Sequence, residues 1–352
     1  MSIPYRHRRM LSRFGTLLLA LLLIFIVAWL CWVVWLQRYV IYTDNGATLN
    51  FQQSSYELSG KEAVPPKAAQ NISIFYNEGA DAIDTTKEMT QLNGYYITSE
   101  MFQQDIDYVM LQVERFPAGT PVMIDMKGAF GSFFYNSNLP DAVMSASTNI
   151  EQVGKLITRL HTKGFYTIAR ISAFRDRTFG ENHVSSGLYL LNRKGLWMDS
   201  DGMYWLDPTN STTTSWITSV VLELKDLGFD EVVLDNFCFP NSDKYIFNGD
   251  KAAALQSAAA TLMSTCSSSK FVLSFQVADT SFILPEGRCR MYISGIGASG
   301  IAPAASKAQL SEPDIRLVFL AESGDTRYEK YSVLRSIHVA DEVEARKNNA
   351  SE

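Results

Sequence analysis

Two stretches of the sequence share one pattern: KLITRLHTKGFYTIAR at residues 155–170 and VVLELKDLGFDEVVLD at residues 220–235. Each begins with apolar residues at helical spacing, reaches a glycine (Gly164 or Gly228), and continues at once with a short apolar run. Glycine readily adopts the left-handed conformation that ends many helices. Both stretches therefore predict a helix followed, after a minimal loop, by a strand that is buried on both faces.

Five further short apolar runs indicate strands of the same kind. They are GYYIT from Gly94, PVMIDM from Pro121, FVLSFQVA from Phe271, MYIS from Met291 and IRLVFLA from Ile315. Apolar stripes at helical spacing lie between strands, within 102–113, 150–160 and 216–227. Thr148 and Glu151 predict a capping box at the start of the second of these helices.

The connections differ in length in a regular way. The helix-to-strand loops are minimal, whereas the strand-to-helix loops take about 20 residues after the second strand and about 40 after the third, from Ser172 to Thr212. This asymmetry predicts an α/β fold, a (β/α)8-type TIM barrel with an elaborated C-terminal face. A doubly wound open sheet is the alternative, because about seven strands can be counted. No eighth strand is evident after Tyr331, so the barrel could also be incomplete or degenerate there.

The N-terminal part predicts a membrane anchor. Residues 16–36 carry no charge, and a helix of that length crosses a hydrocarbon core of roughly 30 Å. Basic residues precede this run and no acidic residue occurs among the first 36, so residues 1–15 are expected in the cytoplasm and the rest of the chain outside. A cleaved secretory signal is the alternative, but the length of the run and its Trp-rich end favour an uncleaved transmembrane helix.

The remaining chain divides into a polar stalk at 37–70, the barrel at 71–340 and a disordered tail at 341–352. Beyond residue 36 there are about ten more acidic than basic residues, which argues against nucleic acid as a partner. Three cysteines outside the predicted span exclude a disulfide framework, although Cys266 and Cys289 could pair. Four histidines without paired Cys/His spacing predict no metal, and no nucleotide-binding motif predicts a cofactor.

Polar residues that follow barrel strands are the candidates for function. Three carboxylates are the catalytic candidates, namely Asp235 at the end of the fourth strand, Asp279 after the fifth and Glu322 after the seventh. The candidates for substrate contact are Asp125, Lys127, Arg170, Asp176, Trp205, Asp207 and Asn236. Carboxylates and aromatic residues suit carbohydrate, because sugar rings stack on indoles and a carboxylate pair can cleave a glycosidic bond.

Each candidate also has a structural interpretation. Asp235 could cap the next segment or pair with Arg170, and Asp125 and Lys127 could form an ion pair. Trp205, like Trp197, could simply pack within its loop. These alternatives stay open at the level of the sequence.

Four segments, in order, resemble a bacterial family of membrane-anchored predicted glycoside hydrolases. They are MIDMKGAFGSFFY (123–135), GFYTIARISAFRD (164–176), GMYWLDP (202–208) and GFDEVVLDNFCFP (228–240). The resemblance implies a TIM barrel distantly akin to α-amylase-type barrels, with Asp235 in the catalytic position. The family pattern has an arginine where this chain has Cys238, and an arginine there would orient the carboxylate. A chitinase-type site is excluded, because Phe237 stands where its acid is required.

We therefore expect a membrane-anchored, extracytoplasmic glycoside hydrolase that acts on a cell-envelope or exported polysaccharide by carboxylate acid/base catalysis. The alternative is an inactive barrel that binds glycan or scaffolds envelope proteins. A second carboxylate close to Asp235 would favour the hydrolase, because hydrolysis of a glycosidic bond requires two.

Overall fold

The computed structural model describes residues 89–278 and 280–343, together with 40–43, 46–49 and the single positions 22, 25 and 29. The hairpin β1 (Val40–Thr43) and β2 (Gly46–Leu49) lies within the predicted stalk and is antiparallel. The predicted transmembrane helix at 16–36 lies outside the described residues apart from the three single positions, and so does the tail beyond 343. Within the described part of the chain, no helix is long and apolar enough to span a membrane.

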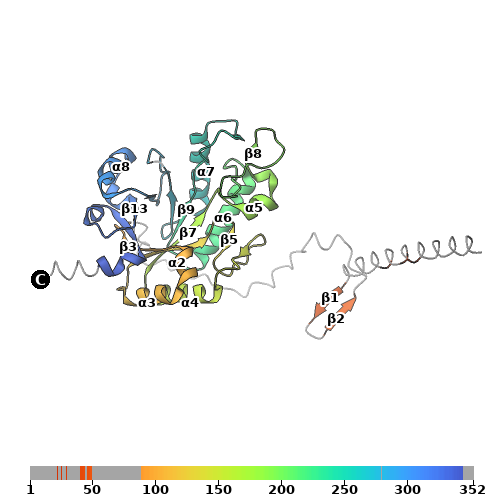
Figure 1. Cartoon of the computed structure of the whole chain (residues 1–352), viewed down its shortest axis with the longest axis horizontal. Coiled ribbons are helices and arrows are strands. Elements are labelled where there is room, and N and C mark those ends of the chain that lie inside the picture. Colours follow the sequence, from red (N-terminus) through yellow and green to blue (C-terminus); the bar gives the residue numbers. More distant parts are fainter. Residues whose placement is uncertain are drawn as a thin grey trace, which may run out of the picture. The chain divides into compact units, whose positions relative to one another are not determined.

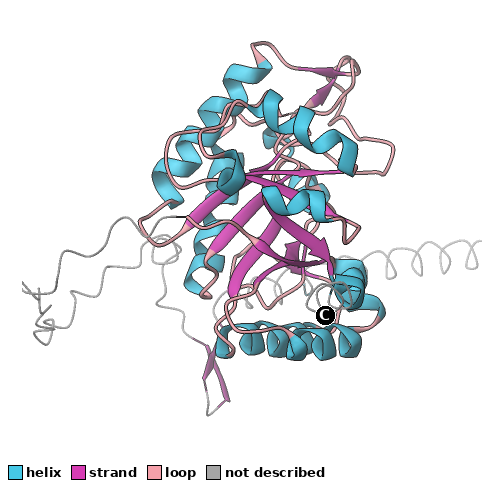
Figure 2. Cartoon of the chain, turned by 90° about the vertical axis from the view of Figure 1, so that its left-hand side faces the viewer, coloured by secondary structure: helices cyan, strands magenta, loops and turns pink. Residues whose placement is uncertain are grey.

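Eight parallel strands close into a barrel in the described residues from 89 onward (Figures 1 and 2). In order around the barrel they are β3 (Asn93–Ile97), β4 (Pro121–Lys127), β7 (Tyr166–Ser172), β9 (Glu231–Asp235), β11 (Val272–Gln276), β12 (Met291–Ser294), β13 (Leu317–Ala321) and β14 (Ser332–Ser336). The pairing of β14 with β3, and of β3 with β4, closes the ring. The predicted TIM barrel is confirmed, and the alternatives of an open sheet or a missing eighth strand are wrong.

Figure 2 shows the strands in the centre with helices around them. These helices are α2 (Ser99–Gln104), α3 (Ile106–Arg115), α4 (Ile150–Thr162), α6 (Ser211–Asp226), α7 (Lys251–Cys266), α8 (Ile301–Ala308) and α9 (Pro313–Arg316). The long loops after the second to fourth strands carry short elements: β5 (Ser132–Phe133), β6 (Val143–Met144), α5 (Arg177–Asn182), β8 (Tyr189–Leu190) and β10 (Tyr245–Ile246).

The two glycine junctions end their helices as predicted. Gly164 and Gly228 have φ angles of +68° and +95°, in the left-handed region that glycine tolerates. The N–H of the residue after each glycine donates to a carbonyl five residues earlier, from Phe165 to Leu160 and from Phe229 to Leu224. These bonds satisfy carbonyls at the end of the helix and return the chain directly to the barrel.

Two details of the predicted helices are wrong. The first apolar stripe forms two helices, because the Asp105 carboxylate accepts from the N–H of Tyr108 and starts α3 there. The second helix is capped by Asn149, which accepts from the N–H of Gln152, rather than by a capping box at Thr148. Asparagine is an equally good N-cap residue, so the neighbouring position provides the cap.

The eighth strand escaped prediction because its sequence, SVLRS, is not a continuous apolar run. All five residues are nevertheless buried. Arg335 is only 1% exposed, and it donates to the side chains of Asn93 and Glu329. Paired polar groups of this kind can be buried in a strand, and a criterion based on hydrophobicity alone misses them.

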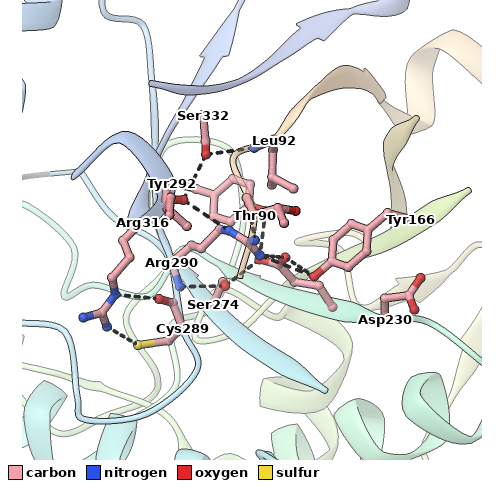
Figure 3. Close-up of polar contacts among 12 residues, drawn as sticks. Thr90, Leu92, Tyr166, Asp230, Ser274, Cys289, Arg290, Tyr292, Arg316 and Ser332 are labelled. Atoms are coloured by element: carbon pink, nitrogen blue, oxygen red, sulfur yellow. Dashed lines mark hydrogen bonds and ion pairs between the residues drawn. The ribbon is translucent and has the colours of Figure 1, made fainter. Parts of the chain in front are cut away.

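A polar cluster closes the N-terminal end of the barrel (Figure 3). Glu231 at the start of β9 and Arg290 just before β12 form an ion pair of 2.5 Å, and their side chains are at most 2% exposed. The Glu231 carboxylate also accepts hydrogen bonds from the hydroxyls of Ser274, Tyr166 and Tyr292. Burying two charges is tolerated only when partners replace the lost water, and here both charged groups have such partners.

The guanidinium of Arg290 reaches beyond the ion pair. It donates to the backbone carbonyls of Thr90 and Ile315, which precede β3 and β13 respectively. Together with the hydroxyl partners of Glu231, these bonds join residues on or beside six of the eight strands. The cluster therefore fixes the heights of these strands relative to one another.

We predict that Arg290→Met lowers the free energy of unfolding by about 3–5 kcal/mol, because the Glu231 carboxylate would stay buried without its counter-ion. Urea denaturation measures this change. The double variant Glu231→Gln with Arg290→Met serves as the control and should recover part of the loss, because it removes the unpaired charge. Equal stability of Arg290→Met and the wild type would contradict the assigned role.

Candidate active site

Strand β9 contributes side chains to both ends of the barrel interior. Its alternate residues Glu231, Val233 and Asp235 face inward: Glu231 lies in the polar cluster, and Val233 belongs to the core inside the barrel. Asp235 therefore faces the opposite, C-terminal mouth of the barrel, where the long loops begin. The sequence-based placement of Asp235 at the end of the fourth barrel strand is confirmed.

The Asp235 carboxylate is partly buried, and its Oδ1 accepts from the N–H of Asn236 at 2.7 Å. Asn236 has a φ angle of +53°, a left-handed conformation that asparagine tolerates better than most residues. Its side-chain amide donates to the hydroxyl of Ser172 on the neighbouring strand β7. Asn236 thus turns its backbone N–H onto the carboxylate and anchors the turn to β7.

Charges around the mouth act on Asp235 in both directions. Burial is the largest influence and raises the pKa of this carboxyl above its ordinary value of 3.8. The positive charges of Arg170 and Arg175 and the N–H of Asn236 lower the pKa, whereas the negative charge of Asp125 raises it further. The net effect is a raised pKa, and groups with perturbed pKa values are common at functional sites.

Asp125 and Arg170 form a two-pronged ion pair beside Asp235. The Arg170 Nε and Nη2 donate to the two Asp125 oxygens at 2.6 and 3.0 Å, and Ser99 N–H adds a third bond at 2.9 Å. The sequence left open whether Asp125 would pair with Lys127 and Asp235 with Arg170; the structure instead pairs Asp125 with Arg170. This pair presents a fixed charged surface at the mouth, because both carboxylate oxygens are already bonded.

Glu322 lies across the mouth from this pair, directly after β13, and is exposed. Its negative charge adds to burial in raising the pKa of Tyr96, an inward-facing residue of β3. The charges of Asp125 and Arg170 act on the same tyrosine. Asp125, Arg170, Asp235 and Glu322 thus all lie around the mouth, although they are far apart in the sequence.

Gln276 is a mouth residue that the sequence analysis missed. It ends β11, the strand next to Asp235, and its Oε1 is buried without a hydrogen-bond partner among the described residues. An acceptor in that position suits a donor from a ligand, such as a sugar hydroxyl. The position of Gln276 at the end of a strand could have identified it from the sequence. It was missed because its side chain is an amide, and the catalytic candidates were chosen among carboxylates.

Lys127 and Asp176 do not join the group at the mouth. A bulge in β4 between Asp125 and Lys127 turns the Lys127 side chain outward, level with Ile171 in the shell between strands and helices. There its ammonium contacts the Asp176 carboxylate at 2.6 Å, and both side chains are at most 2% exposed. Asp176 also caps α5 and accepts from the indole of Trp216. This buried ion pair ties the third loop to β4.

The remaining predicted contacts lie in the third loop or outside the described residues. Trp205 is 7% exposed and its indole donates to Asp199, so its ring packs in the core rather than facing solvent. Asp207 accepts from the backbone and hydroxyl of Thr209 within a turn before α6. Asp279 lies outside the described residues. Substrate contact by Trp205 and Asp207 stays a prediction. The local hydrogen bonds of both side chains already give them a structural role.

Cys238 lies near Asp235, at the position where the resemblance described above implies an arginine. Burial, with the charge of Asp235, raises the pKa of the Cys238 thiol to about 11, so it stays protonated at neutral pH. Arg175 acts electrostatically on both side chains and is held by ion pairs to Asp199 and Asp201. Arg170 and Arg175 thus supply positive charge near Asp235. All three described cysteines, Cys238, Cys266 and Cys289, are free thiols.

No group of three or more His, Cys, Asp or Glu side chains within the described residues is arranged to hold a metal ion. The mouth instead contains positively and negatively charged side chains, which supply both hydrogen-bond donors and acceptors. Such a set suits a neutral, hydroxyl-rich ligand.

We predict that Asp235→Asn raises the melting temperature at pH 7. Folding raises the pKa of Asp235, so the folded chain binds the proton more tightly, and stability falls as pH rises from 3.8 through the raised value. The asparagine avoids this loss and can still accept from the N–H of Asn236. Calorimetry at several pH values should show the gain at pH 7 and its disappearance below pH 3.8. A lower melting temperature for the variant at pH 7 would contradict the assigned environment.

Comparison with known proteins yields one family and several distant structures. A family model described as "Putative glycosyl hydrolase domain" matches residues 94–278, from β3 to just after β11. No curated protein is detectably similar to the chain. A crystal structure of a hypothetical protein from Ruminiclostridium thermocellum shows 24% identity and a TM-score of 0.43, covering 52% of this chain and 96% of its own.

Two glycosidase structures resemble the chain less closely in sequence. The α-galactosidase from Lactobacillus brevis shows 9% identity and a TM-score of 0.49, covering 74% of this chain and 40% of its own. The GH20 exo-β-N-acetylglucosaminidase from Vibrio harveyi shows 10% identity and a TM-score of 0.47, covering 65% and 41%. The chain thus spans about two fifths of these two proteins. The family model, which covers more than half of the sequence, shows that the chain belongs to the family of the putative glycosyl hydrolase domain.

Proposed function

We propose that this protein is a membrane-anchored, extracytoplasmic glycoside hydrolase that acts on a cell-envelope or exported polysaccharide. The observation that carries the proposal is Asp235, a partly buried carboxylate with a raised pKa at the mouth of a barrel from a glycosyl hydrolase family. Hydrolysis of a glycosidic bond needs a second carboxyl group on the other side of the bond.

Glu322 is our candidate for that second group. It follows β13, three strands around the barrel from β9, so a sugar bound over the mouth could lie between the two carboxyls. Asp125 is a weaker candidate, because both of its oxygens already accept from Arg170 and Ser99. Asp279, the third carboxylate expected from the sequence, lies outside the described residues.

Asp235 and Glu322 would share the chemistry as an acid/base pair. One carboxyl protonates the departing glycosidic oxygen, while the other carboxylate acts on the anomeric carbon directly or through water. Burial raises the pKa of Asp235 and so favours its protonated form, which is the form that a general acid needs. Arg170, kept in place by Asp125, and the free acceptor of Gln276 would hold sugar hydroxyls beside the bond.

An inactive barrel that binds glycan is the second candidate. It is favoured by Gln276, because the strand next to Asp235 ends in an amide, which can bind a sugar but cannot transfer a proton. It is also favoured by Cys238, which replaces the arginine of the family pattern. The two candidates differ in whether a glycan that binds is also cleaved.

We predict that Asp235→Asn lowers kcat by at least about 10³-fold on any glycan that the wild type cleaves, because asparagine cannot transfer a proton or act as a nucleophile. Reducing-end release from a panel of envelope polysaccharides measures the activity. Asp230→Asn is the matched control, because Asp230 lies at the other end of β9 and bonds Thr167. A glycan that binds the wild type but is never cleaved would establish the binding barrel instead.

The membrane anchor rests on residues 16–36 and is tested separately. We predict that the full chain sediments with membranes, and that protease added outside intact cells removes the barrel. Replacing two central leucines of this run, Leu21 and Leu22, with arginine should release the protein or abolish its export. Recovery of wild-type protein that begins after Leu36 in a soluble fraction would instead identify a cleaved signal.

A further inference from the structure

A cavity of about 210 Å³ lies beside the candidate active site, between the start of α7 and the loop after β11. Most of its lining is apolar, and no charged side chain is among the described residues that line it. Its apolar lining includes Phe237, Cys238, Ala252, Leu255, Val277 and Phe282, and Gln256 and Ser281 are the polar residues among the described lining. A sugar ring needs hydrogen-bonding partners on several sides, so this lining suits a hydrocarbon group better than a sugar.

One wall of the cavity is aromatic. Phe237 is 1% exposed, and its ring lies 4.8 Å from Phe275 and 5.9 Å from Phe282 between centroids. Phe275 and Phe282 also contact each other at 5.8 Å. Edge-on and tilted contacts of this kind hold aromatic rings in place. Phe237 and Phe282 line the cavity, and their packing against Phe275 supports this apolar wall from behind.

The cavity is built by the same two strand ends as the mouth of the barrel. Phe237 and Cys238 follow Asp235 within three residues, and Val277 follows Gln276 directly. β9 and β11 are neighbours, with Leu234 opposite Phe275. Cys238 lines the cavity and lies close enough to Asp235 for that charge to raise the pKa of its thiol. A ligand held by Asp235 and Gln276 would thus have the cavity next to it.

A second hollow, of about 550 Å³, lies beside the first, because Gln256 and Ile283 line both. Ala260 and Met263 of α7 also line it, together with the polar residues Ser264, Ser267 and Glu286. Ile283 is 68% exposed, so a large apolar side chain that lines both hollows faces solvent. An exposed apolar side chain beside an apolar cavity suits contact with a hydrocarbon chain that extends beyond the cavity.

We propose that the substrate is a glycolipid-type conjugate, and that this cavity binds the first part of its alkyl chain while the sugar lies over Asp235. The inference rests on the proposed function, because it assumes that a glycan occupies the mouth. It assigns the cavity to the aglycone, the non-sugar group on the other side of the bond to be cleaved. A chain that leaves the sugar toward Cys238 would enter the cavity and continue along α7.

Paired methyl and hexyl glycosides of glucose, galactose and N-acetylglucosamine test this assignment. Binding to the full chain is measured by calorimetry in a fluorinated surfactant, which mixes poorly with hydrocarbon. Burial of each CH₂ group strengthens binding roughly fourfold. We therefore expect at least one hexyl glycoside to bind more than about tenfold tighter than its methyl counterpart, and 1-hexanol alone to bind much more weakly than that hexyl glycoside.

Ala252 and Ala253 provide a matched pair of variants. Both are exposed residues in the first turn of α7, and the Asp250 side chain accepts from both backbone N–H groups, but only Ala252 lines the cavity. Ala252→Trp should fill the cavity and reduce the hexyl advantage to less than about twofold, with methyl glycoside binding unchanged. Ala253→Trp should keep the full advantage.

Equal binding of hexyl and methyl glycosides in the wild type would overturn the inference, and so would equal effects of the two tryptophan variants. Hexanol that binds as tightly as the hexyl glycosides would also overturn it, because the cavity would then act independently of the sugar. These measurements do not require cleavage. A hexyl advantage without hydrolysis would support this inference and reject only the catalytic proposal, whereas hydrolysis without a hexyl advantage would do the reverse.

Discussion

The buried ion pair between Glu231 and Arg290 requires polar partners from several strands, and the rest of the barrel depends on this requirement. A carboxylate and a guanidinium this deeply buried are stable only when protein groups replace the water that each has lost. Tyr166, Ser274 and Tyr292 supply donors to Glu231, and backbone carbonyls before β3 and β13 accept from Arg290. A shift of any of these strands by one residue would leave a charge or a hydroxyl unpaired, so the cluster selects one register among those that hydrophobic packing alone would allow.

That register determines what the mouth contains. Because alternate residues of a strand share a face, fixing Glu231 inside the barrel also places Val233 and Asp235 inside, one above the other. The same period brings Arg170 above Tyr166 and Ile168 on β7. Stability at one end of the barrel and the candidate chemistry at the other are therefore linked through the pleat of the strands. The raised pKa of Asp235 shows the cost of this arrangement, because burial there opposes the charged form.

The sequence contained enough information for the fold but only part of the site. Gly164 and Gly228 marked the junctions between helix and strand because their backbone role is local. β14 was missed because Arg335 is buried through partners distant in sequence, Asn93 among them. Lys127 was expected beside Asp125 because a regular strand repeats every two residues, and a bulge cannot be read from that repeat. Gln276 stands at a strand end as Asp235 does, but it was missed because the catalytic candidates there were chosen among carboxylates. Arg175 lies within the segment 164–176, but its effect on Asp235 depends on tertiary structure that the sequence does not show.

The buried pair of Lys127 and Asp176 has a consequence for ligand binding. It fastens the start of α5 to β4, and the short ribbon of β8 and β10 joins the loop after the third barrel strand to the loop after the fourth. Loops tied in this way have little conformational entropy left to lose. A ligand would meet walls that already have their final shape, so less of its contact energy would be lost to ordering the protein. Affinity and selectivity would then depend mainly on how well the shape of the ligand matches these walls.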